Sequence, residues 1–202
     1  MDRQGVEYGR ASIFQVASQD PDLAVNIILS GPCGVGKTTV GAWLANLLLA
    51  RFVDFDRLRS QYFPAETAVA PSPFSVSYLD LLECLPAIRA QVPADFVLAI
   101  GGDTLFRRNV SNPDRLRSMR EFITLCPAHV AVLTADRDAL LPRYLSVGHR
   151  TMQGFEMVWQ DWLEIVEPCW RQCANLWIDT SLLSPPEVAQ EIQTLLDAGE
   201  DR

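Results

Sequence analysis

The sequence predicts an α/β fold in which a mostly parallel, five-stranded sheet lies between two layers of helices. Short apolar runs alternate with longer segments whose apolar residues recur at helical spacing, in one continuous series. A glycine-rich turn also separates the first apolar run from the first helix. A sheet built in this way binds its ligands at the carboxyl ends of its strands.

Five apolar runs are expected to form the strands. They cover residues 25–30, 52–54, 96–101, 129–134 and 175–179. The second run is the shortest, and the third passes directly into two glycines and an acid. Short, continuously apolar runs are typical of strands that are buried on both faces of a parallel sheet.

Helices are expected between these strands. One follows the glycine-rich turn, and another is marked by apolar residues at helical spacing over 78–88. A third begins at Ser111-Asn112-Pro113, where a capping residue precedes a proline at the first helical position. The last opens with Ser184-Pro-Pro-Glu187, which has the pattern of a capping box.

Four residues are expected to interrupt the helical region between the fourth and fifth strands. Pro142 and Pro168 fall inside otherwise helical stretches and should kink or end them. Gly148 and Gly154 bracket a segment at about 147–154 that we expect to be a mobile lid.

The composition indicates one ordinary globular domain, since 49% of the 202 residues are hydrophobic and 21% are charged. We expect residues 25–198 to form this domain after a polar N-terminal extension at 1–24. The net charge of −8 argues against a surface for nucleic acid or anionic membrane. The sequence has no apolar run that approaches the length of a membrane span.

The five cysteines are irregularly spaced and odd in number, which fits a reduced, cytoplasmic compartment better than a disulfide framework. Cys169 and Cys173 are four residues apart and could share one face of a helix as metal ligands. Because the chain has only two histidines and no nearby Cys-x-x-Cys pair, buried helix thiols are the favoured interpretation. We expect a monomer or a weak homodimer.

A phosphate-binding loop is the most specific motif in the chain. The stretch Gly31-Pro-Cys-Gly-Val-Gly36-Lys37-Thr38 fits the pattern G-x-x-x-x-G-K-[ST] at every required position. Lys37 is the only lysine, beside sixteen arginines. A strand, a glycine turn and a helix N-terminus bring backbone N–H groups and the positive end of the helix dipole to one place.

This motif predicts that the chain binds ATP with Mg²⁺. Lys37 would place a positive charge near the β- and γ-phosphates, and the Thr38 hydroxyl would bind the metal ion. The expected nucleotide ligands are Gly31, Pro32, Cys33, Gly34, Val35, Gly36, Lys37, Thr38 and Thr39.

Two acidic motifs follow strands of the predicted sheet. Asp54 and Asp56 end the second strand, and alternation along an extended segment would place both carboxylates on one side. The third strand runs into Gly101-Gly102-Asp103. Carboxylates beside a phosphate site can hold Mg²⁺ and its waters or accept a proton from an attacking hydroxyl, so Asp54 and Asp103 are candidate metal ligands. Glycines at this point let a substrate approach the backbone closely.

Together these residues resemble the shikimate kinase-like branch of the small P-loop kinases. The resemblance covers nearly the whole chain after residue 24. It is carried by residues 31–38, 52–56, 99–102, 143–150 and 174–180. It implies a P-loop NTPase fold, a small-molecule acceptor, and transfer of the γ-phosphoryl group of ATP to an acceptor hydroxyl.

The resemblance also implies roles for individual residues. Asp54 would support Mg²⁺ and its waters, and Asp56 would contact the acceptor hydroxyls and help to activate one of them. Gly101 and Gly102, with Asp103, would line the acceptor pocket. The arginines that neutralise the transferring phosphoryl group would be Arg143, as a fixed contact, and Arg150, as a moving one. Lys37, Asp54, Asp56 and Arg150 are thus the expected catalytic residues.

Three positions depart from the shikimate kinase pattern. Asp103 stands where the family has a third glycine, and Asp80 stands near the position of a carboxylate-clamping arginine. Val166 occupies the position of a second clamping arginine. Because bidentate arginine is the natural holder of a carboxylate, these changes predict an acceptor other than shikimate.

A nucleotide-dependent switch ATPase that acts on a protein partner is the alternative function. A Ras-like GTPase is excluded because its guanine-binding motif Asn-Lys-x-Asp needs a second lysine. A AAA+ motor would need a longer chain and an Asp-Glu pair, whereas Asp103 is followed by Thr104. The intact phosphate loop and aspartates argue against a degenerate scaffold.

Overall fold

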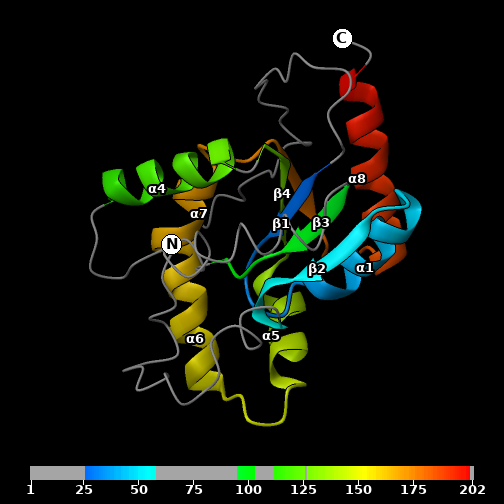
Figure 1. The fold of residues 1–202 in the computed structure, drawn as a ribbon. Helices are drawn as coiled ribbons and strands as arrows, with labels where there is room; N and C mark the ends of the chain where they lie inside the picture. Colours follow the sequence, from blue (N-terminus) through cyan, green and yellow to red (C-terminus); the bar gives the residue numbers. More distant parts are fainter. Residues whose placement is uncertain (1–25, 58–94, 103–111, 126, 201–202) are drawn as a thin grey trace, which may run out of the picture.

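The computed structural model describes residues 26–57, 95–102, 112–125 and 127–200 (Figure 1). Its sheet has five strands in the order β2-β3-β1-β4-β5, and every pair of neighbours is parallel. This confirms the predicted fold class. The strands are β1 (Ile27–Ser30), β2 (Arg51–Asp54), β3 (Phe96–Ala99), β4 (His129–Thr134) and β5 (Leu176–Asp179).

The central strand β1 explains why the sheet has two buried faces. All four of its residues are fully buried, and it pairs with β3 on one side and β4 on the other. Ile28 belongs to a cluster that includes Met119 and Trp170. Ile27 and Leu29 point into a second cluster, on the other face of the sheet. The apolar character of the whole strand follows from this burial on both faces.

Helices form a layer on each face of the sheet (Figure 1). On one face α1 (Lys37–Leu47) lies beside α8 (Pro185–Glu200), and both contribute to the cluster around Ile27 and Leu29. On the other face, α4 (Asn112–Leu125) lies against α7 (Glu167–Trp170). Within the described residues, two further α-helices are α5 (Arg137–Leu145) and α6 (Met152–Asp161).

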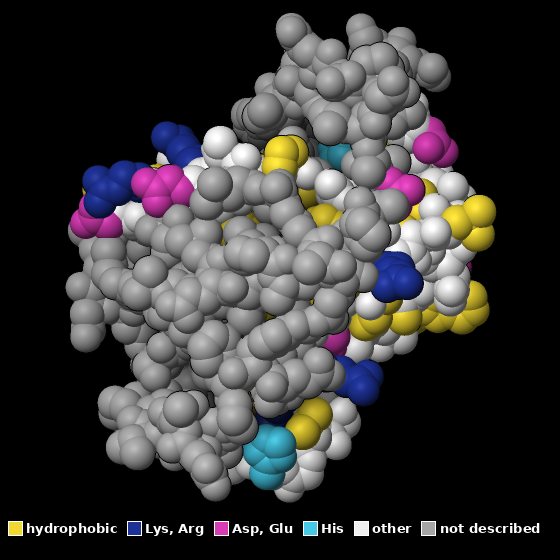
Figure 2. Space-filling view, viewed as in Figure 1, with side chains coloured by type: hydrophobic (Ala, Val, Ile, Leu, Met, Phe, Trp, Pro, Cys, Tyr) yellow, Lys and Arg dark blue, Asp and Glu magenta, His cyan; other side chains and the backbone are white. Residues whose placement is uncertain are grey.

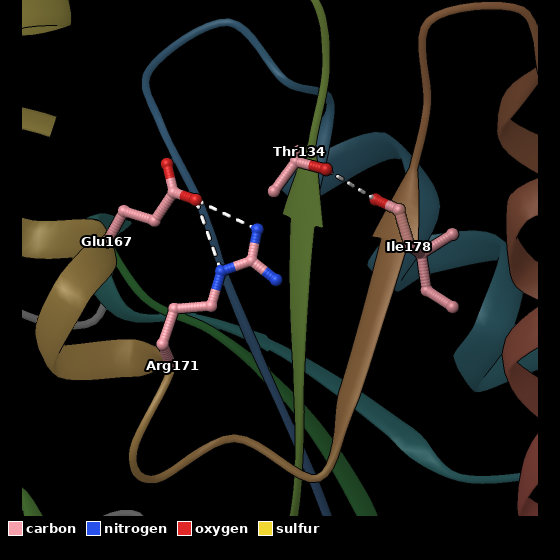
Figure 3. Close-up of polar contacts among 4 residues, drawn as sticks. All are labelled: Thr134, Glu167, Arg171 and Ile178. Carbon is pink, nitrogen blue, oxygen red and sulfur yellow. Dashed lines mark hydrogen bonds and ion pairs between the residues drawn. The ribbon is translucent and has the colours of Figure 1, made fainter. Parts of the chain in front are cut away.

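The chain from α6 to α7 is helical throughout, but it widens into a π-helical turn, η2, at Trp162–Val166. The end of this segment is tied to the sheet. Glu167 accepts hydrogen bonds from Arg171 at 3.2 and 2.8 Å (Figure 3). The Arg171 guanidinium also lies 3.8 Å from the centre of the Trp177 ring on β5. The contact with Trp177 therefore connects the end of α7 to β5.

Strands β4 and β5 are joined near their carboxyl ends by a side chain as well as by the backbone ladder. The Thr134 hydroxyl donates to the Ile178 carbonyl at 3.3 Å (Figure 3). Immediately beyond, the Thr180 N–H donates to the Thr134 carbonyl at 2.7 Å. The turn after β5 is therefore held against the end of β4, where parallel sheets bind their ligands.

Several expected boundaries need correction. Helix α5 continues three residues beyond Pro142, so this proline does not end it. The segment between α5 and α6 is residues 146–151, here called the lid loop, and Gly154 lies inside α6. The N–H of Gly154 donates to the side chain of Thr151, which caps that helix. Gly154 is therefore not a loop hinge, because a capped first turn already holds it.

The Glu187 side chain forms its half of the capping box that is expected at the start of α8. The Glu187 carboxylate accepts from the Ser184 N–H at 2.8 Å and from its hydroxyl at 2.6 Å. These bonds lower the pKa of Glu187, because they favour its charged form. The expected helix over 78–88 and the proline-rich loop at 63–75 lie outside the described residues.

The described surface carries charges of both signs. Figure 2 shows cationic and acidic side chains interspersed over α4, and Arg117 forms an ion pair with Asp114 on this helix. Three exposed apolar side chains lie in or just after α1, at Trp43, Leu47 and Leu49, and others lie on α5, α6 and the segments that follow them. No helix within the described ranges is both long enough and apolar enough to cross a membrane.

Candidate active site

The phosphate loop has the backbone that its sequence predicts. It joins β1 to α1, and Gly31, Gly34 and Gly36 all have positive φ angles, of 144°, 89° and 100°. Such angles are unfavourable for residues with a side chain. At Gly31 the space is also missing, since a Cβ there would lie 2.3 Å from the Leu133 carbonyl oxygen. This glycine therefore sets how closely the loop follows the neighbouring strand.

The N-terminus of α1 is available to an anion. Gly36 is its N-cap, no side chain among the described residues caps it, and its first turn contains no acid. The unpaired N–H groups of a helix start and the positive end of its dipole together attract phosphate. The backbone N–H groups at the start of α1 therefore have no side-chain oxygen as an acceptor, which leaves them to a phosphate.

Lys37 is the first residue of α1, and its side chain folds back over the loop. Its ammonium donates to the carbonyl oxygens of Gly31 at 2.9 Å and Pro32 at 3.0 Å. The positive charge is thereby held at the centre of the phosphate loop.

Thr38 and Asp54 meet across the site. The Thr38 hydroxyl donates to Asp54 Oδ2 at 3.0 Å, and the other oxygen of Asp54 accepts from the Arg57 N–H at 3.3 Å. Mg²⁺ prefers hard oxygen ligands and takes only one or two from the protein, so this pair suits it. The described residues contain no cluster of three or more His, Cys, Asp and Glu side chains that could form a cage for a metal ion.

Asp56 does not share a strand face with Asp54. Strand β2 ends at Asp54, and residues 55–57 form a helical turn. Phe55 is fully buried, whereas Asp56 is exposed. The expected alternation is wrong because the chain coils where an extended segment was assumed. Asp103 lies outside the described residues.

Gly102 lies directly against the start of the phosphate loop. A Cβ on Gly102 would lie 2.8 Å from the Gly31 carbonyl oxygen and 2.9 Å from the Trp162 ring. The indole N–H of Trp170, a fully buried residue, donates to the Gly102 carbonyl at 3.0 Å. Gly101 precedes it and is half-buried. The glycine turn after β3 is therefore wedged between the phosphate loop and two tryptophans.

Arg143 is bound to the turn after β5. Its guanidinium donates to the Thr180 hydroxyl at 3.2 Å and to the carbonyls of Thr180 at 3.0 Å and Ser181 at 3.4 Å. The Thr180 hydroxyl in turn donates to the Val35 carbonyl in the phosphate loop at 3.4 Å. These bonds hold the Arg143 guanidinium beside the phosphate loop.

Arg150 is the penultimate residue of the lid loop, and its guanidinium rests on an aromatic ring. Its guanidinium carbon lies 4.7 Å from the centre of the Tyr144 ring, and its N–H donates to the Val147 carbonyl at 2.9 Å. Tyr144 in turn touches the phosphate loop, because a Cβ on Gly34 would lie 3.3 Å from the Tyr144 nitrogen. The two lid-region arginines therefore flank the phosphate loop in different ways.

Sequence reasoning missed Tyr144, Thr180, Trp162 and Trp170. Tyr144, Trp162 and Trp170 lie in helical segments, where an aromatic residue usually indicates an ordinary core position. No local sequence pattern indicates that such a residue contacts a glycine of another element. Thr180 lies just after a predicted strand, in a region where ligands gather. That position is the one signal that could have singled it out.

Comparison with known proteins gives the family. A shikimate kinase from Caldanaerobacter subterraneus subsp. tengcongensis is 31% identical over 172 residues, which cover 83% of this chain and 93% of that protein. The chain belongs to the shikimate kinase family. A shikimate kinase from Acinetobacter baylyi is 28% identical, over 90% of this chain and 98% of its own length. The family model for shikimate kinase matches residues 33–69.

Solved structures share the fold. A shikimate kinase from Acinetobacter baumannii, in complex with shikimate, has a TM-score of 0.67 at 24% identity, covering 90% of this chain and 97% of that one. A gluconokinase from Sinorhizobium meliloti 1021 has a TM-score of 0.57 at 17% identity, covering 89% and 95%. The chain is an ATP-dependent phosphotransferase of the small-molecule P-loop kinase type.

Proposed function

We propose that this kinase transfers the γ-phosphoryl group of ATP·Mg to a hydroxyl of a small molecule other than shikimate. The proposed transfer from ATP·Mg rests on the arrangement of Lys37 and Thr38 at the uncapped N-terminus of α1, beside Asp54. These groups supply a cation, a metal-binding oxygen pair and backbone donors in one place. The nucleotide would bind there through residues 31–39, with Arg143 beside it.

The proposed transfer is a single in-line step. The acceptor oxygen bonds to the γ-phosphorus while the bond from that phosphorus to the bridging oxygen breaks, and ADP leaves with the bridging oxygen. The acceptor proton passes to the Asp56 carboxylate. Lys37 and Arg150 balance the charge on the transferring group, and Thr38 and Asp54 would hold Mg²⁺. The metal ion, when bound, would neutralise negative charge on the phosphates.

Val166 supports an acceptor other than shikimate. It is 4% exposed and lies in the apolar cluster with Trp162 and Trp170, so its position offers no charge to a carboxylate. The two relatives named shikimate kinase favour shikimate as the acceptor instead. The fold leaves the choice open, because a shikimate kinase and a gluconokinase both share it.

A single-turnover assay tests the proposal. The purified chain would be mixed with γ-labelled ATP and Mg²⁺, alone and with a set of small hydroxyl compounds that includes shikimate and gluconate. We expect label in a phosphorylated acceptor, and none from a Lys37→Ala variant. Label that appears only as inorganic phosphate, whatever acceptor is supplied, would instead favour the switch ATPase.

A further inference from the structure

Tyr144 joins three parts of the site that are far apart in the sequence. Its backbone touches the phosphate loop, where a Cβ on Gly34 would lie 3.3 Å from the Tyr144 nitrogen and 3.4 Å from its Cα. Its ring receives the guanidinium of Arg150 at 4.7 Å. Its hydroxyl lies against the first turn of α6, 3.1 Å from a Cβ built on Gly154. The backbone, the ring and the hydroxyl of Tyr144 each make one of these contacts.

The ring itself is held firmly. Tyr144 is 8% exposed, and it meets the edge of Phe155 on α6 with ring centres 5.4 Å apart. Phe155 is stacked on Trp159 at 6.2 Å. A ring enclosed in this way has little freedom to change rotamer, so it offers a cation a surface of fixed position.

Arg150 has no stronger partner to hold it in the described part of the chain. No carboxylate there forms an ion pair with its guanidinium, which is half-buried and faces the Tyr144 ring. Arg137 shows the contrast, since it lies 5.6 Å from the Phe155 ring but is also paired with Glu156. A cation over an aromatic face gains electrostatic attraction while all its N–H donors stay available to a phosphate.

We propose that Tyr144 positions Arg150 for phosphoryl transfer by holding its guanidinium at a place fixed relative to the phosphate loop. The inference rests on the proposed function, because it assigns Arg150 to the transferring phosphoryl group. Tyr144 acts through Arg150 and is a positioning residue. The ring face carries this role, and the hydroxyl does not.

Variants of Tyr144 separate the ring from the hydroxyl. Tyr144→Phe keeps the ring face and should retain Mg·ATP turnover within about twofold. Tyr144→Leu removes it and should lower turnover by about tenfold, within the range measured for cation–π contacts. Affinity for a non-hydrolysable ATP analogue should change much less. Where Tyr144→Leu does not fold, Tyr144→Met fills the space without a ring.

A double-mutant cycle with Arg150→Ala decides between positioning and a general structural role. If Tyr144 acts through Arg150, Tyr144→Leu should cause no further loss in the Arg150→Ala background. Arg137→Ala is the matched control, since it removes a neighbouring cation over a ring and should leave turnover unchanged. An equal loss from Tyr144→Leu in both backgrounds would overturn the proposal.

Hydrogen exchange without any nucleotide keeps this test apart from the test of the kinase activity. Amides of the lid loop, residues 146–151, should exchange faster in Tyr144→Leu than in the wild type, and Tyr144→Phe should match the wild type. Equal exchange in all three proteins would refute the contact even in an active kinase. Faster exchange in a protein that transfers no phosphoryl group would support the contact and reject the proposed function.

Discussion

At the scale of single residues, the charge of Lys37 is held by the loop that it serves. Its ammonium bonds to two loop carbonyls, Gly31 and Pro32, so it stands at the phosphate site before any nucleotide arrives. Preorganised charge of this kind acts most strongly on the transition state, because no reorganisation is needed during transfer. The side chain therefore matters more for turnover than for folding.

Lys37→Ala should leave the fold intact and lower turnover about 100-fold or more. Circular dichroism and the thermal midpoint check the fold, and phosphate release from Mg·ATP checks turnover. Lys37→Arg is the matched control for charge. It should also lose activity, because a planar guanidinium cannot replace a compact ammonium between two carbonyls. Normal turnover in a folded Lys37→Ala protein would reject the assignment of the phosphate loop.

Asp54→Asn and Asp56→Asn should differ in effect. Asp54 touches Thr38, so its loss should raise the Mg²⁺ concentration needed for half-maximal turnover. Asp56 is exposed in the helical turn after β2, so its loss should spare ATP binding and slow transfer to the acceptor. Magnesium titrations and binding of an ATP analogue distinguish the two. Equal, negligible effects of both substitutions would mean that Asp54 and Asp56 are solvated side chains with no role in transfer.

Gly102→Ala should distort the site, because the added Cβ would meet backbone 2.8 Å away and the Trp162 ring 2.9 Å away. Overpacking of this kind costs about 1–3 kcal/mol of folding free energy. Gly148→Ala is the control, since a Cβ there meets no atom within 4 Å. Chemical denaturation of both variants gives the comparison. A stable Gly102→Ala protein would mean that the two loops are not in contact.

At the scale of elements, the lid loop and the start of α8 are held by different kinds of contact. The loop between α5 and α6 carries Arg150 beside the phosphate site, with one contact through a ring. The start of α8 is instead fixed by a carboxylate that accepts two hydrogen bonds from Ser184. The first contact leaves the N–H donors of Arg150 available to a ligand, whereas the second uses the carboxylate within the chain.

Residues 146–151 should exchange hydrogen more slowly when an ATP analogue binds, because the phosphates give Arg150 a second partner beside the Tyr144 ring and the closed loop excludes water. Arg150→Ala should then lower turnover far more than it lowers affinity for the analogue. Hydrogen-exchange mass spectrometry and analogue titration measure the two effects. If neither exchange nor turnover changes, residues 146–151 do not act as a lid.

The stability contributed by Glu187 should depend on pH. The Ser184 hydrogen bonds lower the pKa of Glu187 in the folded chain, so their stabilisation is present above the ordinary carboxyl pKa. It should fade as the pH falls from about 4.5 through the lower, native pKa. Glu187→Gln should therefore melt below the wild type at pH 7, and the difference should shrink below pH 4. A constant difference across this range would contradict the role of the charge.

The elements could be predicted well where burial is complete. Continuous apolar runs specified β1 and β4 within two residues, because buried strands have no polar positions that blur their pattern. The sequence could not show that the chain coils at Phe55, since an aspartate on either side fits a strand end and a turn equally well. The π turn at Trp162–Val166 was also hidden, because its spacing resembles that of an α-helix.

At the scale of the whole molecule, the site was predictable only as far as its parts are local. The phosphate loop lies within eight consecutive residues, and its motif named them all. Contacts between distant segments carry no such signature. Arg143 donates a hydrogen bond to Thr180, which is 37 positions away in the sequence, and Trp170 donates one to Gly102, which is 68 positions away. Those pairings depend on how the sheet brings its strand ends together.

The choice of acceptor cannot be inferred from the whole fold, because a shikimate kinase and a gluconokinase share it. The side chains that line the acceptor site must therefore select the acceptor. Shikimate should be a poor acceptor. Asp80 is an acid near the first expected clamp position, and Val166, at the second, gives no donor to a carboxylate. Losing two charge-assisted hydrogen bonds of about 1.5–3 kcal/mol each weakens binding by roughly two to four orders of magnitude.

Initial rates measured against rising shikimate, with gluconate and other small polyols in parallel, test this expectation directly. We expect no saturation by shikimate at concentrations where a better acceptor saturates the enzyme. The Lys37→Ala variant provides the background rate. Efficient, saturable phosphorylation of shikimate would show that the chain binds that carboxylate by other groups. The arginines outside the two expected clamp positions would then be the first to substitute.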